Sequence, residues 1–228
     1  MARILTRAFT CRAAGLVVGL VVAGNAAAQT GTVSGTITTT AKGTAPLRVT
    51  IDQTVCGNAL PDDSIVVDAR GRLANAVISL AGLRRPERKE AAVINERCRF
   101  APRVQVAKPN AIVRTTSRDA VLHTTQAQSE NGRTIFNVAL PVPGINISKP
   151  IGAAGTVRLT CNTHPWMRGW VIVTDDASAI SGADGRFSID NVPPGTYEVR
   201  VWHESLKGAP QKITVSAGTA TTANFQLK

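Results

Sequence analysis

Three residues of one short stretch could bind a metal ion together. Cys161, His164 and Met167 follow one another at intervals of three residues. They supply a thiolate, an imidazole and a thioether, a combination of soft donors that suits copper. A second imidazole is available upstream from His123, at the end of an apolar-rich run. We therefore predict a copper site formed by His123, Cys161, His164 and Met167, soft enough to hold the metal in either oxidation state.

The stretch 161–173 resembles the copper loop of the cupredoxins, and its Cys-x-x-His-x-x-Met spacing resembles that of amicyanin. The resemblance implies one mononuclear type 1 copper site, with His123, Cys161 and His164 as equatorial ligands and Met167 as the axial one. It also implies that the ring edge of His164 faces the surface where a redox partner docks. Cupredoxins usually carry Asn after the first histidine, where it ties the two ligand loops together. Thr124 stands at that position here and departs from the pattern.

Other interpretations of the same residues remain open. Cys161 could be an ordinary core residue, or it could form a disulfide, which would destroy the copper site. A binuclear copper centre needs two cysteines in the loop, which has one, and a multicopper oxidase needs several His-x-His pairs, which the chain lacks. A saturated set of four ligands also leaves no open position for a substrate. We therefore expect an electron carrier and not an enzyme.

Residues 1–28 have the pattern of a cleaved secretory signal. Arg3, Arg7 and Arg12 precede an apolar run at 13–23, and small residues at 26–28 form a cleavage site. The apolar run is too short to span a membrane as a stable helix, and no other long apolar stretch follows. The expected location of the mature protein is the periplasm, without stable membrane insertion.

The charge of the chain indicates the kind of partner. The formal net charge of +11 falls to +8 when the three arginines of the signal are removed. A basic surface favours an acidic redox partner, and the resemblance to amicyanin implies a periplasmic dehydrogenase or a cytochrome. Nucleic acid is excluded by the compartment and by aromatic residues too sparse to act as stacking platforms. The oligomeric state is left open.

Three cysteines remain after the signal is removed, and in an oxidising compartment an odd number leaves one thiol unpaired. If the metal loop reserves Cys161, then Cys56 pairs with Cys98. Such a disulfide contributes about 2–4 kcal/mol by restricting the unfolded chain. The alternative, in which Cys161 pairs with either of them, remains the sharpest test of the copper site.

The hydrophobic pattern predicts an all-β protein. No window shows a convincing helical period over three turns, and short alternating runs are separated by Gly, Pro and Asp turns. Residues 126–133 form a polar stretch with an Asn-Gly turn, and 141–150 form a loop. The predicted strands are 31–38, 47–51, 64–68, 76–80, 100–106, 111–116, 134–140, 157–160, 197–202, 212–215 and 223–227. A turn opens into a further strand over 181–189, and the resemblance to the cupredoxin loop implies a strand over 168–173.

The C-terminal part has a different character. The pieces Asp-Gly-Arg-Phe at 184–187, Val-Pro-Pro-Gly-Thr-Tyr at 192–197 and Asn-Phe-Gln-Leu at 224–227 are similar to the carboxypeptidase regulatory-like domain, a small transthyretin-like sandwich. We expect a Greek-key cupredoxin sandwich over 65–175 and this second, smaller β-sandwich over 176–228. The strands of 29–64 could complete the smaller sandwich, because 31–37 resembles its first strand. The copper domain would then be an insertion.

Two further alternatives concern the last histidine and the function. His203 could approach the copper loop, or it could be a strand-end residue bonded to Glu204 or to a backbone carbonyl. The chain could be a copper carrier, although it lacks the Met and His enrichment expected of one. It could also be a non-redox binding module for carbohydrate or envelope protein, although a single Tyr offers no row of surface aromatics.

Overall fold

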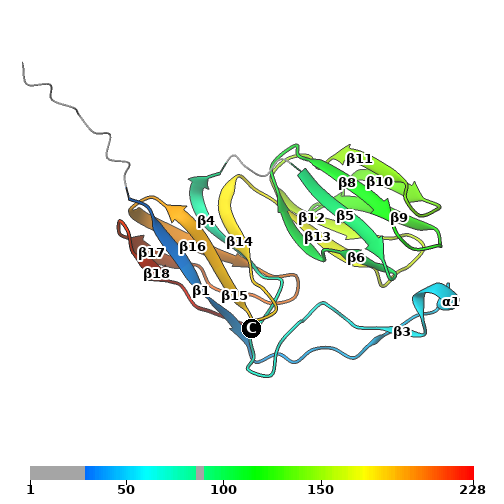
Figure 1. The fold of residues 1–228 in the computed structure, drawn as a ribbon, viewed down its shortest axis with the longest axis horizontal. Coiled ribbons are helices and arrows are strands. Elements are labelled where there is room, and N and C mark those ends of the chain that lie inside the picture. The colour runs from blue at the N-terminus through cyan, green and yellow to red at the C-terminus, as the bar shows by residue number, and fades with distance from the viewer. Residues whose placement is uncertain (1–28, 86–89) are drawn as a thin grey trace, which may run out of the picture.

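The structure is a computed structural model, and it describes residues 29–85 and 90–228. The predicted secretory signal at 1–28 lies outside the described residues. The described chain forms nineteen β-strands and one helix of four residues, which confirms the all-β prediction. The strands form two β-sandwiches side by side (Figure 1). We call the one built from β5 to β13 the central sandwich, and the other the flanking sandwich.

The flanking sandwich combines strands from both ends of the described chain. In one sheet β1 lies between β15 and β18 and also pairs with β19; the other sheet has the order β14-β4-β16-β17. The alternation of β1 points Val33 and Ile37 into the core between the two sheets. The strands are β1 (Gly31–Thr39), β4 (Val77–Arg84), β14 (Asp176–Ile180), β15 (Arg186–Val192), β16 (Gly195–Trp202), β17 (Gln211–Val215), β18 (Ala220–Thr222) and β19 (Phe225–Leu227).

The central sandwich also has two sheets. Their orders are β10-β9-β12-β13-β7 and β11-β8-β5-β6, and they enclose a separate apolar core. The strands are β5 (Glu90–Glu96), β6 (Arg99–Ala101), β7 (Val104–Ala107), β8 (Ile112–Ser117), β9 (His123–Ser129), β10 (Thr134–Leu140), β11 (Asn146–Pro150), β12 (Gly155–Thr160) and β13 (Arg168–Val173).

The strand pairing corrects the expected range 65–175 for the copper domain. β4 lies within that range, but it pairs with β14 and β16 of the flanking sandwich. Ile78 and Leu80 of β4 are buried in the flanking core, which gives the physical reason for this pairing. The central sandwich is therefore inserted between two strands that are direct neighbours. The chain leaves the flanking sandwich after β4 and returns to it at β14. At this point the backbone N–H of Arg85 donates to the carbonyl of Asp175 over 2.8 Å.

The two sandwiches are joined by an apolar and an ionic contact. Trp170 of β13 packs edge-on against Trp202 of β16, with ring centroids 5.6 Å apart, in a small apolar cluster of both sandwiches. Beside it, Nη2 of Arg103 donates to Glu204 over 2.7 Å, and the side chains of this pair are only 12% and 6% exposed. The ion pair is largely shielded from water, and the two indole rings are partly buried.

A long excursion of the chain connects β1 to β4. It contains β2 (Leu47–Arg48), α1 (Gln53–Cys56) and β3 (Ala59–Leu60), and β2 pairs with β3. Figure 1 shows α1 at the tip of this excursion, next to the end of the central sandwich that is farthest from the flanking sandwich. We call residues 47–60 the covering segment. The expected strand at 64–68 does not form, because Asp62 and Asp68 turn the chain there through side-chain bonds to backbone N–H groups.

A disulfide fastens the covering segment to the central sandwich. Cys56 at the end of α1 is bonded to Cys98, which lies between β5 and β6. The two cysteines pack with Val49 and Leu60 in a small buried cluster, and Trp166 lies against it. None of the helices in the described residues is long and apolar enough to cross a membrane.

Candidate metal centre

The topology brings the predicted ligands to one edge of a sheet. His123 is the first residue of β9, and Cys161 comes directly after the last residue of β12. These strands are antiparallel neighbours, with Thr160 opposite Gln126, so the start of one lies beside the end of the other. His164 lies in the turn between β12 and β13. Strand pairing therefore closes the gap of 38 residues between His123 and Cys161.

Three of the four predicted ligands form a tight, buried group. The ligand atoms of His123, Cys161 and His164 all lie within 4.8 Å of one another. Sγ of Cys161 is 3.6 Å from Nδ1 of His164, and the two imidazole rings are 4.6 Å apart between centroids. Both histidines are fully buried and Cys161 is 5% exposed. Cys161 is a free thiol, so the alternative in which it forms a disulfide does not apply to this structure.

Met167 lies in the same apolar core as Cys161. It is 1% exposed, and its backbone N–H donates to the carbonyl of His164 over 3.0 Å, which closes the turn between them. The structure thus buries the Met167 side chain in the core that also contains Cys161.

Thr124, which stands where cupredoxins usually carry Asn, links the two ligand loops. Its Oγ1 accepts a hydrogen bond from the backbone N–H of Asn162 over 2.7 Å. The same hydroxyl lies 3.7 Å from Sγ of Cys161, and the backbone N–H of Thr124 donates to that sulfur over 3.3 Å. A threonine therefore ties the loop of His123 to the loop of Cys161.

The surroundings of Cys161 favour its thiolate form. Burial raises the pKa of the thiol, but the adjacent His123 side chain and the backbone N–H groups of Thr124 and His164 outweigh burial and lower the pKa to about 5. A thiolate is the form in which cysteine binds metal ions. The loop is thus electrostatically prepared for a cation at neutral pH.

His123 offers one ring nitrogen to the site and binds Asp119 with the other. Its Nε2 is 2.9 Å from Oδ2 of Asp119. Its Nδ1 is buried and, within the part of the chain that the structure describes, has no hydrogen-bond partner. Burial lowers the pKa of His123, but Cys161 and Asp119 outweigh it and raise the pKa overall. An unpartnered buried nitrogen beside a thiolate fits a metal ligand, because leaving it unbonded carries a desolvation cost.

His164 has a similar arrangement, and its location corrects the expectation that its ring edge faces solvent. The ring is fully buried, and its Nε2 lies 3.0 Å from Oδ2 of Asp52 in the covering segment. On the other side the ring packs against Trp166, with centroids 5.1 Å apart. The indole N–H of Trp166 donates to the carbonyl of Cys98 over 3.1 Å, next to the disulfide. A docking partner therefore cannot touch the His164 ring directly.

His203 is not among the grouped ligand residues. It lies in the flanking sandwich, where its Nδ1 accepts the backbone N–H of Ser205 over 3.2 Å. Burial lowers its pKa, and Arg103 nearby acts in the same direction, while Glu204 opposes them. Of the two interpretations, the structure bears out the strand-end histidine. The partner is the backbone N–H of Ser205, although Glu204 or a carbonyl was expected.

Two residues of the site, Asp119 and Asp52, were not among those predicted from the sequence. Asp119 precedes His123 by four residues and could have been found from that spacing. Asp52 is separated from His164 by 112 residues, so no local signal points to it.

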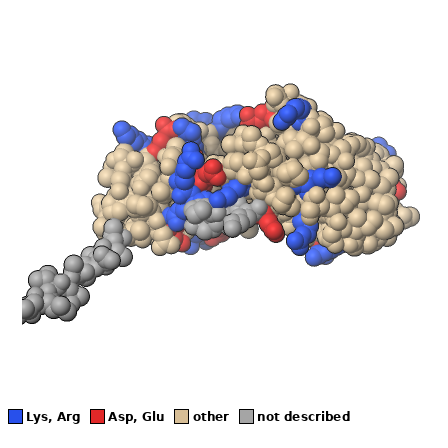
Figure 2. All heavy atoms as spheres, turned by 90° about the horizontal axis from the view of Figure 1, so that it is seen from above, with Lys and Arg blue, Asp and Glu red and all other residues tan. Residues whose placement is uncertain are grey.

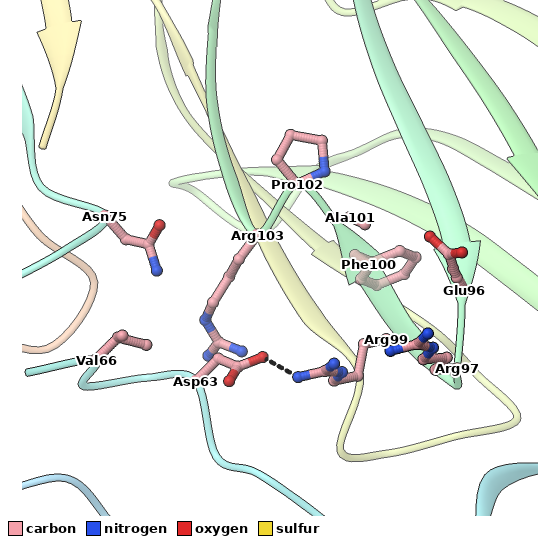
Figure 3. Close-up of a pocket in the computed structure, with 10 residues that line it drawn as sticks. All are labelled: Asp63, Val66, Asn75, Glu96, Arg97, Arg99, Phe100, Ala101, Pro102 and Arg103. Atoms are coloured by element: carbon pink, nitrogen blue, oxygen red, sulfur yellow. Dashed lines mark hydrogen bonds and ion pairs between the residues drawn. The ribbon is translucent and has the colours of Figure 1, made fainter. Parts of the chain in front are cut away.

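A cavity of about 490 Å³ lies between the excursion and β5–β6 (Figure 3). None of the four predicted ligands lines it. Most of the charged side chains that line it form ion pairs. Arg99 donates to Asp63 over 2.7 Å, the interaction drawn as a dashed line in Figure 3, and Arg103 is bound to Glu204. The cavity thus lies between part of the excursion and the central sandwich, and it is not the site of the predicted ligands.

Comparison with known proteins identifies a family in the C-terminal part. The carboxypeptidase regulatory-like domain family matches residues 153–228, which confirms the predicted resemblance. The match begins before the expected boundary at 176 and includes β12 and β13, which the structure places in the central sandwich. No curated protein matches the chain.

Solved structures similar to this chain include cupredoxins. A purple cupredoxin from Nitrosopumilus maritimus is 24% identical, covers 37% of this chain and 99% of its own, and has a TM-score of 0.33. Amicyanin from Paracoccus versutus is 17% identical, covers 42% and 97%, and has a TM-score of 0.33. A copper-containing nitrite reductase from Thermus scotoductus is 18% identical, covers 41% and 24%, and has a TM-score of 0.31. The chain thus matches the carboxypeptidase regulatory-like domain family over 153–228, and cupredoxins are among the solved structures that are similar to part of it.

Proposed function

We propose that this protein is an exported electron carrier with one mononuclear type 1 copper site formed by His123, Cys161, His164 and Met167. The observation that carries the proposal is the buried group of one thiolate and two imidazoles within 4.8 Å. The unpartnered Nδ1 of His123 and the low pKa of Cys161 support it, because both fit a bound cation. Copper bound there would supply one-electron redox chemistry.

The residues of the chain would keep the site rigid and dry. Neighbouring strands fix His123 and Cys161, and Thr124 bonds both ligand loops together. Trp166 and the covering segment close the side of His164 against water. Ligands that hardly move between oxidation states keep the reorganisation cost of electron transfer low, which suits outer-sphere transfer.

We further propose that the protein works in the periplasm. The secretory pattern of 1–28 supports this, and so does the disulfide between Cys56 and Cys98, because disulfides persist in oxidising compartments.

The proposed partner is an acidic redox protein such as a periplasmic dehydrogenase or a cytochrome. The basic charge of the chain supports this choice. Figure 2 shows Lys and Arg side chains on one face of both sandwiches, with Asp and Glu between them. Since His164 is covered, a partner at this end of the central sandwich would meet the covering segment, where Ile51 and Val55 are 43% and 41% exposed.

A copper titration followed by visible absorption tests the proposal. One equivalent of Cu(II) added to the mature protein should give an intense thiolate-to-copper band, and Cys161→Ser should abolish it. His123→Gln should also lose the band, whereas His203→Gln is a matched control that should keep it. Absence of the band in the unaltered protein would reject the type 1 site and favour a non-redox binding module. A band whose copper passes readily to a chelator would favour the copper carrier.

A further inference from the structure

A carboxylate from outside the central sandwich bonds one of the proposed ligands. Asp52 lies in the covering segment, and its Oδ2 is 3.0 Å from Nε2 of His164. The side chain of Asp52 is 34% exposed, whereas that of His164 is fully buried. Nδ1, the other nitrogen of the ring, lies 3.6 Å from Sγ of Cys161. The carboxylate thus holds the outer edge of the ring while the inner edge faces the site.

The covering segment is built to present Asp52 in this position. Asp52 has a left-handed backbone conformation, with φ 54° and ψ 34°, directly before α1. Its carbonyl accepts the N–H groups of Val55 and Cys56 over 3.0 and 2.9 Å. Cys56 is in turn bonded to Cys98 in the central sandwich. Only three residues therefore lie between Asp52 and the covalent anchor at Cys56, which limits how far Asp52 can move.

The other histidine shows what such a carboxylate does. Asp119 binds Nε2 of His123 over 2.9 Å, and Nδ1 of that ring is left free to face Cys161. A carboxylate on the outer nitrogen of an imidazole fixes the proton there, orients the ring and makes the inner nitrogen a stronger ligand. Asp52 and His164 repeat this arrangement at the second imidazole of the group.

We propose that Asp52 is a positioning residue of the metal centre, and this inference rests on the proposed copper site. Its carboxylate holds His164 with the proton on Nε2 and Nδ1 directed at the metal. Its negative charge, in a partly shielded position, stabilises Cu(II) more than Cu(I), because the interaction grows with the charge of the ion. The covering segment is therefore part of the metal centre, although no predicted ligand lies in it.

The test compares Asp52→Asn and Asp52→Ala with Asp63→Asn. Asp63 is a matched control, because it lies in the same excursion and bonds the central sandwich through Arg99 but is not at the site. Removing the charge of Asp52 should weaken Cu(II) binding about tenfold or more relative to Cu(I). That change corresponds to a rise of about 59 mV in the one-electron reduction potential for each factor of ten. Asp63→Asn should leave the potential unchanged.

A second measurement does not need copper. Imidazole nitrogen NMR of the metal-free protein should show His164 held as the Nε2–H tautomer, and Asp52→Ala should lose this preference. Unchanged potential and unchanged tautomer in the Asp52 variants, with the copper band intact, would overturn the inference. If the unaltered protein gives no copper band but its His164 tautomer depends on Asp52, the copper proposal fails while the positioning role stands.

Discussion

His123 and His164 each present Nε2 to a carboxylate, but the two carboxylates come from very different parts of the molecule. Asp119 is four residues from His123 and is 8% exposed. It also accepts the backbone N–H groups of Arg97 and Cys98 over 2.7 and 2.8 Å. Asp52 arrives from the covering segment and is one-third exposed. One half of the site therefore belongs to the sandwich itself, whereas the other depends on an attached segment.

Because of this difference, we expect Asp119 to act mainly on the stability of the fold and Asp52 mainly on the properties of a bound metal. Asp119 satisfies three donors in a buried place, so the fold of the central sandwich depends on it. Asp52 is partly exposed, so solvent screening limits its contribution to the free energy of unfolding. Its charge still acts on His164, to which it is bonded. We expect the two carboxylates to differ more in their effect on unfolding than on the properties of a bound metal.

The largest effect is expected from Asp119→Ala. This variant leaves the Nε2 of His123 and the N–H groups of Arg97 and Cys98 without their acceptor. Unsatisfied buried donors cost about 1–3 kcal/mol each, so we expect a loss of about 3 kcal/mol or more in the free energy of unfolding. Urea denaturation measures it, with Asp119→Asn as the milder variant. A loss below about 1 kcal/mol would contradict the structural role of Asp119.

The second-largest loss in the free energy of unfolding is expected from the double variant Cys56→Ser with Cys98→Ser. Loss of the disulfide should cost about 2–4 kcal/mol. It should also release the covering segment and expose the ring of His164, while His123 stays covered. Hydrogen exchange should accelerate over 47–60 and remain slow in β9. Equal exchange in both proteins would show that packing alone holds the covering segment in place.

Thr124→Val should have an intermediate effect on both halves of the site. The variant removes the hydroxyl that accepts the N–H of Asn162 and contacts the sulfur of Cys161. We expect a loss of about 1–2 kcal/mol in the free energy of unfolding. Thr124→Ser keeps the hydroxyl and should lose clearly less. Equal losses in the two variants would attribute the effect to the methyl group and not to the link between the ligand loops.

The smallest effect on stability is expected from Asp52→Ala. Partly exposed pairs contribute about 0–1 kcal/mol, so the free energy of unfolding should change by less than about 1 kcal/mol. Thermal unfolding beside Asp119→Ala checks the contrast directly. A loss as large as that of Asp119→Ala would mean that Asp52 supports the fold in the same way as Asp119 does.

Part of the fold could be predicted, and the exceptions have local causes. The β-rich pattern and most strands followed from alternation, as in β1 and β16. β9 was missed because its sequence, His-Thr-Thr-Gln-Ala-Gln-Ser, is polar, although Thr125 and Ala127 point inward and are fully buried. Glu90–Glu96 was not predicted as a strand either, although Ala91 and Val93 are buried at alternate positions along it.

The sequence by itself determined the candidate ligands and the presence of one free thiol outside the predicted signal, but not which cysteine carries it. The spacing of Cys161, His164 and Met167 fits one turn between two strands, and an odd number of cysteines left one unpaired. These signals are local or depend on a count, so they can be read along the chain.

Only the tertiary structure decided how the site is closed and to which sandwich each strand belongs. β4 joins the flanking sandwich because Ile78 and Leu80 are buried in the flanking core. Asp52 reaches His164 because the excursion between β1 and β4 crosses to the far end of the central sandwich, where a disulfide holds it. Contacts of this kind join residues far apart in the chain, and they depend on shape and packing, for which a single sequence carries no periodic signal.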